Sequence, residues 1–140
     1  MSAETTVVKF VAEYCDYDQS LASDDDIFHN VRITGDDVDD FMSDFADKFG
    51  VDMTNYRWYF HHEEEGHNFG GVFFKSPDRR VDYIPITVAI LAAAIRTKKW
   101  PVEYPVHELP SVRKDILINQ LLAGISLLGL ILFLWMRFVS

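Results

Sequence analysis

Residues 34–51 read TGDDVDDFMSDFADKFGV, and this stretch predicts the best-formed helix of the chain, Asp36–Phe49. Apolar side chains recur in it at the spacing of one buried helical face, namely Val38, Phe41, Met42, Phe45 and Phe49. Thr34, with an acidic residue three positions later, predicts a capping box, and Gly50 predicts a left-handed turn that ends the helix. The expected fold class is therefore mainly α.

The opposite face of this predicted helix is acidic. Its aspartates follow one another at helical spacing, and they are Asp36, Asp37, Asp40, Asp44 and Asp47. Neighbouring like charges on a helix repel each other by roughly a few tenths of a kcal/mol per pair. A carboxylate at the helix start gains from the helix dipole, but Asp44 and Asp47, near the C-terminus, do not. Two interpretations stay open. The face is either a solvated surface that keeps a small domain soluble, or a docking surface for a basic protein partner.

The remainder of residues 1–100 predicts two more helices and one hairpin. Residues 5–15 place an apolar stripe on one helical face. Residues 84–95, IPITVAILAAAI, are too few to cross a membrane and predict a core helix, with an interfacial helix as the alternative. Residues 56–60 (YRWYF) and 72–75 (VFFK) can pair as a short β-hairpin insertion. Residues 1–100 are thus expected to form a small soluble helical bundle.

The last quarter of the chain is of a different kind. From Ile116 to Met136 it reads ILINQLLAGISLLGLILFLWM, without a charged residue. At about 1.5 Å per residue, this length matches a hydrocarbon core of about 30 Å, so we expect it to contact the lipid bilayer. The predicted transmembrane helix covers residues 115–137. A proline-containing linker over residues 101–114 precedes it, and a short tail, residues 138–140, follows.

Charge is distributed unevenly along the chain, whose formal net charge is −9. Residues 1–70 hold 17 acidic and 4 basic residues, whereas residues 71–140 hold 5 acidic and 9 basic residues. The acidic balance argues against nucleic-acid binding. Five basic residues precede the apolar stretch within residues 96–114 and only Arg137 follows it, so the positive-inside rule predicts a cytoplasmic domain. The start of the chain, MSAETTVVKF, does not have the pattern of a signal peptide.

Residues 61–67, HHEEEGH, form the candidate metal-binding segment. Imidazole and carboxylate groups suit Zn²⁺, Ni²⁺ and Cu²⁺, and the candidate ligands are His61, His62 and His67. A hydrated loop is the alternative interpretation, because the HExxH spacing does not occur. A metal- or pH-sensing membrane protein that uses this loop is accordingly a second functional hypothesis. The sequence holds no motif of a nucleophilic, phosphate-binding or dinucleotide-binding enzyme, so we expect neither an enzyme nor a cofactor.

The segment VRITGDDVDDFMSDFADKFGVDM resembles the second helix of acyl carrier proteins, and the order of helices over residues 5–100 is similar to theirs. More closely, the soluble part resembles a small family of uncharacterised bacterial proteins with an acyl-carrier-like domain. The shared features are a TGDD-type turn, an FxxxFGVDM helix end, a YF-rich segment and a final helix that ends in Lys/Arg-Trp. This resemblance implies an acyl-carrier-like bundle in a bacterial protein.

One departure from the carriers concerns their chemistry. A serine at the helix start carries phosphopantetheine in true carriers. That position falls on Gly35 here, which has no side-chain oxygen to take the phosphodiester. The resemblance therefore implies a domain without this group, and an atypical carrier modified at Thr34 is the alternative. In carriers, partners dock on the corresponding helix through basic residues. We therefore expect a membrane-anchored, non-catalytic adaptor in the bacterial inner membrane, with the acidic helix face turned to a basic protein partner.

Overall fold

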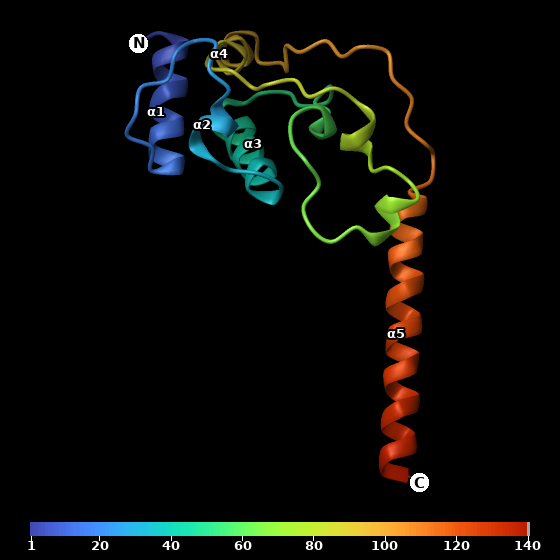
Figure 1. Ribbon diagram of the computed structural model, residues 1–140. Coiled ribbons are helices and arrows are strands. Elements are labelled where there is room, and N and C mark those ends of the chain that lie inside the picture. The colour runs from blue at the N-terminus through green and yellow to red at the C-terminus, as the bar shows by residue number, and fades with distance from the viewer. Residues whose placement is uncertain (140) are drawn as a thin grey trace.

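The computed structural model describes residues 1–139 and consists of helices joined by loops. The α-helices are α1 (Ala3–Cys15), α2 (Ile27–Val31), α3 (Asp36–Phe49), α4 (Val88–Thr97) and α5 (Lys114–Val139), and the 3₁₀ turns are η1 (Trp58–Phe60), η2 (Phe69–Val72) and η3 (Pro77–Arg80). Helices α1 to α4 gather in one small domain, and α5 leaves it as a long rod (Figure 1). The predictions of a mainly helical fold and of a long apolar C-terminal helix are confirmed.

Helix α3 has the bounds that the apolar spacing predicts. Its buried side chains are Val38, Phe41, Met42 and Phe45. Gly50 adopts a φ of 63° and its N–H donates to the carbonyl of Ala46, as a left-handed helix end requires. Val51 follows this turn and is buried. The C-terminal end of α3 is therefore encoded locally, as predicted.

The predicted cap at the start of α3 is wrong. Gly35, with a φ of 54°, holds the capping position, and no side chain of the adjoining sequence accepts a hydrogen bond there. The N–H of Asp36 instead donates to Glu65 Oε2 at 3.2 Å. Because the first N–H groups of a helix have no partner inside it, an acceptor is needed. A loop residue 29 positions later supplies it in place of Thr34.

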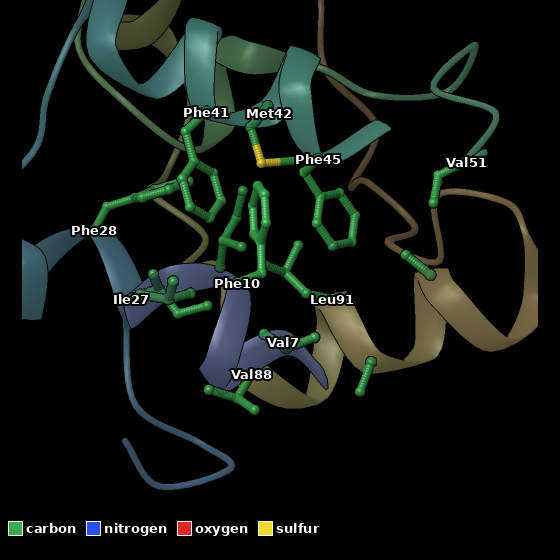
Figure 2. Close-up of a cluster of buried hydrophobic side chains, with 14 of the residues drawn as sticks. Val7, Phe10, Ile27, Phe28, Phe41, Met42, Phe45, Val51, Val88 and Leu91 are labelled. Carbon is green, nitrogen blue, oxygen red and sulfur yellow. The ribbon is translucent and has the colours of Figure 1, made fainter. Parts of the chain in front are cut away.

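The core lies where α1, α3 and α4 meet (Figure 2). Phe10 of α1 packs against Phe41 and Phe45 of α3, with ring centroids 5.1 and 5.9 Å apart. Leu91 of α4 is completely buried beside them. The short helix α2 adds Phe28, whose ring meets Phe41 edge-on at 5.4 Å. Aromatic rings from three helices thus fill the centre of the domain.

The predicted β-hairpin is wrong, because no strand occurs within residues 1–139. Residues 56–60 end in the turn η1, and residues 72–75 begin at the end of η2. Asn68 accounts for η2, since its side-chain oxygen accepts a hydrogen bond from the N–H of Gly71 at 2.8 Å. Such a local side-chain bond competes with the pairing of strands, and the pair Gly70-Gly71 has a low preference for strand.

Residues 101–113 contain no helix or strand and run along the domain to α5 (Figure 1). The hydroxyl of Tyr104 accepts hydrogen bonds from Trp100 Nε1 at 2.7 Å and from the N–H of Arg57 at 3.2 Å. His107 Nε2 lies 2.8 Å from the hydroxyl of Tyr59. The segment predicted as a linker therefore contacts the domain, through Tyr104 and His107 among other side chains.

A polar cluster joins the start of α5 to η2. Asn119 accepts a hydrogen bond from the N–H of Gly70 at 2.8 Å and donates one to Asn68 at 2.9 Å. Asn68 donates in turn to Asp115 at 2.8 Å, and Arg113 binds the same carboxylate at 2.6 Å. Beyond this cluster, residues 120–138 are exposed. Helix α5 is long and apolar enough over residues 114–138 to cross a membrane.

We predict that Gly70→Ala separates η2 from α5. A Cβ at this position would collide with the backbone of Asp115, and overpacking of this kind costs about 1–3 kcal/mol. Amide hydrogen exchange of residues 68–74 should become about 5- to 150-fold faster, because each 1.4 kcal/mol corresponds to about a factor of ten. Gly124→Ala is the control, since a Cβ there meets nothing within 4 Å. Unchanged exchange in Gly70→Ala would contradict the packing of η2 on α5.

Candidate functional site

The acidic face of α3 is exposed to solvent. All five aspartates predicted as the partner-binding set are exposed: Asp36, Asp37, Asp40, Asp44 and Asp47. None of them belongs to an ion pair in the part of the chain that the structure describes. Lys48, at the end of the same helix, lies 3.8 Å from Glu13 of α1. The charge of this face is therefore left available to a group outside the domain.

Glu65 extends the acidic face beyond the helix. Its carboxylate lies at the start of α3, where it accepts from the N–H of Asp36. A helix N-terminus carries a partial positive charge, which favours a carboxylate there. Glu65 belongs to residues 61–67, predicted as a metal-binding segment or a hydrated loop, and no local signal in the sequence places it beside Asp36. The candidate surface therefore comprises the five aspartates and Glu65, and we call it the acidic surface.

The position to which the carrier resemblance assigns a serine does not suit that residue. Gly35 has a φ of 54°, in the left-handed region that L side chains rarely adopt. A Cβ added there would collide with the side chain of Glu65, whose own Cβ lies 2.7 Å from it. A serine at this position is thus disfavoured both by backbone conformation and by space. Thr34, the alternative position, is exposed.

An open cleft of about 1160 Å³ adjoins the start of α3. Its lining mixes cations, carboxylates and aromatic rings, and includes Arg32, Thr34, Tyr59, Glu65, Arg79 and Tyr83. The hydroxyl of Tyr83 donates to Asp26 at 2.7 Å, and Asp26 also accepts from the N–H of His29 to cap α2. Both contacts hold Asp26 at the start of α2, so they stabilise the fold and do not indicate a ligand in the cleft.

The structure does not bring together the three histidines predicted as candidate metal ligands. His61 is buried within the domain, whereas His67 is exposed and stacks on Phe69. His62 Nε2 lies 3.0 Å from Asp39 Oδ1, so that nitrogen is already bonded. Among residues 1–139 no group of three or more His, Cys, Asp or Glu side chains is arranged to hold a metal ion. The segment 61–67 therefore offers separate contacts instead of a common site.

His61 is instead the centre of a buried hydrogen-bond network. Its Nδ1 lies 2.7 Å from the carbonyl of Ile84, and its Nε2 lies 2.7 Å from the hydroxyl of Tyr104. A carbonyl can only accept, so Nδ1 carries the proton and Nε2 accepts from Tyr104. The Tyr104 oxygen is then free to accept from Trp100 and Arg57, as observed. The network is complete with a neutral imidazole.

Burial lowers the pKa of His61 from 6.5 to about 4. Loss of water disfavours the charged imidazole. The network offers no free acceptor that could stabilise the charged form in place of water. A second proton on Nε2 would face the hydroxyl of Tyr104, which already has two donors. His61 therefore holds residues 100–104 against η1 and stays neutral near pH 7.

The chain was compared with curated proteins, solved structures and family models. No curated protein and no solved structure matches it significantly. A family model does match, over residues 3–103. This range covers α1 to α4 and the loops between them. The chain therefore belongs to the family described as "Protein of unknown function (DUF1493)".

Proposed function

We propose that this protein is a membrane-anchored, non-catalytic adaptor whose acyl-carrier-like helical domain presents the acidic surface to a basic protein partner. The single observation that carries the proposal is the exposure of the five α3 aspartates without an ion-pair partner in the described chain. Opposite charge on a partner would steer association and select among partners. Glu65 adds to the same field from the start of the helix.

The proposed anchor is α5, which would cross the bacterial inner membrane with the domain on the cytoplasmic side. Support comes from its length and apolar surface and from the basic residues that precede it. A tether confines the domain near the membrane and raises its effective concentration towards partners there. A single charged surface of modest affinity is sufficient under these conditions.

The acyl-carrier-like assignment rests on the order of the helices and on the acidic helix that follows a TGDD turn. The misfit at Gly35 supports an interaction role without phosphopantetheine. The domain would then keep the docking surface of a carrier and lack its prosthetic group. Docking without a prosthetic group would account for both the exposed aspartates and Gly35.

The test is capture of the partner from native membranes by the full chain, with crosslinking and mass spectrometry. A triple variant with Asp36→Asn, Asp40→Asn and Asp44→Asn should capture about tenfold less, because three charge contacts of about 0.5 kcal/mol each sum to about 1.5 kcal/mol. Capture by the unmodified protein should fall as salt is raised.

The matched control removes three exposed acids elsewhere, with Asp18→Asn, Asp24→Asn and Glu108→Gln. It has the same net charge as the triple variant, so it separates a local surface from overall acidity. Equal capture by the two variants would contradict the proposal, and so would capture that does not change with salt.

A further inference from the structure

A second surface, unrelated to the acidic one, is apolar and exposed. It consists of four side chains around η2: Phe69 is 65% exposed, Val72 82%, Phe73 73% and Phe74 38%. We call residues 69–74 the aromatic loop. Apolar area left in water loses about 25 cal/mol of hydrophobic stabilisation per Å². Several exposed apolar side chains close together in one loop indicate an interaction site.

The aromatic loop lies at the level where α5 begins. Gly70 donates to Asn119 and packs against the backbone of Asp115, so the loop is held beside the first turns of the helix. Figure 1 shows η2 next to the domain end of α5, away from its C-terminus. The apolar stretch of α5 starts at Ile116. The exposed rings are therefore placed where that stretch starts.

The polar groups of this junction are bonded to one another. Asn119 is a polar residue inside the apolar stretch, and its side chain is used by the N–H of Gly70 and by Asn68. Asp115 is 2% exposed and is bonded to Asn68 and Arg113. Polar groups that enter the hydrocarbon core of a bilayer must find partners within the protein, because water is absent there. This cluster meets that condition and leaves apolar side chains outward.

Cations flank the aromatic loop. Lys75 follows it directly and is exposed, and Lys114 Nζ lies 5.5 Å from the centre of the Phe74 ring. Arg113, by contrast, is paired with Asp115 and Glu64. Lysines at this level suit the phosphates of a bilayer surface, and their aliphatic stems can lie along apolar groups.

We propose that the aromatic loop inserts into the headgroup–acyl boundary of the same phospholipid bilayer that α5 crosses. Continuity between the exposed rings and the apolar surface of α5 selects lipid as the occupant. Two contacts, the helix and the loop, then fix the domain in one orientation on the membrane. The inference rests on the membrane anchoring proposed above and adds a second, peripheral contact to it.

The test uses nitroxide labels on the full chain in vesicles of phosphatidylcholine and phosphatidylglycerol. Cys15 is the sole cysteine, so Cys15→Ala provides the background. Labels are placed by Phe73→Cys and Val72→Cys in the loop, Leu128→Cys within α5 and Asp18→Cys on the far loop of the domain. Collision with oxygen, which enters lipid, is compared with collision with a water-soluble nickel chelate.

We expect the loop labels and the Leu128 label to favour oxygen, and the Asp18 label to favour the chelate. The depth parameter is the logarithm of the ratio of collision with oxygen to collision with the chelate. A positive value at position 128 with negative values at positions 72 and 73 would overturn the inference and leave the anchor intact. Shielding of the loop labels from both reagents would overturn it as well, since a protein would then cover the loop. A negative value at position 128 would reject the anchoring itself.

Discussion

Replacing Phe41 by alanine should lower the free energy of unfolding of the domain by about 3–5 kcal/mol, the range for a buried phenylalanine. Phe41 is completely buried, and its ring meets Phe10 of α1 and Phe28 of α2. Truncation would open a cavity between three helices that cannot close without moving them. Since a domain of this size is stable by about 5–15 kcal/mol, the loss is a large share of the total.

The measurement is urea unfolding of the full chain in detergent micelles, followed by tryptophan fluorescence. Trp58 and Trp100 report on the domain, and Trp135 of α5 contributes a signal from outside it. Val106→Ala is the control, because Val106 is fully exposed, and its effect should stay within about 0.5 kcal/mol. A loss below about 1 kcal/mol in Phe41→Ala would contradict the core described above.

Acid should destabilise the domain through His61. The pKa of His61 is about 4 in the folded protein, against an ordinary 6.5. The unfolded chain thus binds this proton more readily, so the stabilising contribution is complete above pH 6.5 and is lost as the pH falls towards 4. The difference corresponds to about 3 kcal/mol. Tyr104 and Trp100 should separate from η1 in the same pH range.

Unfolding midpoints measured between pH 7.5 and 4 test this expectation. His61→Gln removes the titrating group, and its stability should depend less steeply on pH over this range, whatever its stability at pH 7. His67→Gln is the matched control, because His67 is exposed, and its slope should equal that of the unmodified protein. Parallel pH profiles for His61→Gln and the unmodified protein would show that His61 does not carry the effect.

Several features of the fold were predictable because their signal is local. The apolar positions of α3 recur within one helix, and Gly50 supplies the left-handed end, so the buried face and the C-terminal end of α3 follow from neighbouring residues. The length and composition of α5 follow from residues 116–136 in the same way. The exposure of the α3 aspartates follows from the helix once its apolar face is buried.

Other features were mispredicted because a local pattern competed with a distant contact or a nearer bond. Thr34 has the residue type of a cap, but Glu65 reaches the helix start and Gly35 turns the chain. The run after Val72 has the residue types of a strand, but Asn68 bonds Gly71 and holds a 3₁₀ turn. Helix α2 was missed, since five residues are too few to show a helical period.

By itself the sequence determined the amphipathic helix α3, the apolar helix α5 and the acidic charge of the first half, all properties of residues close together in the chain. Tertiary structure alone decided three things: Glu65 at the start of α3, His61 against Tyr104, and Gly70 against Asn119. These pairs are separated by 29, 43 and 49 residues. A hydrogen bond over such a distance depends on how the packed helices place two loops, and no periodicity or spacing in the chain records that placement.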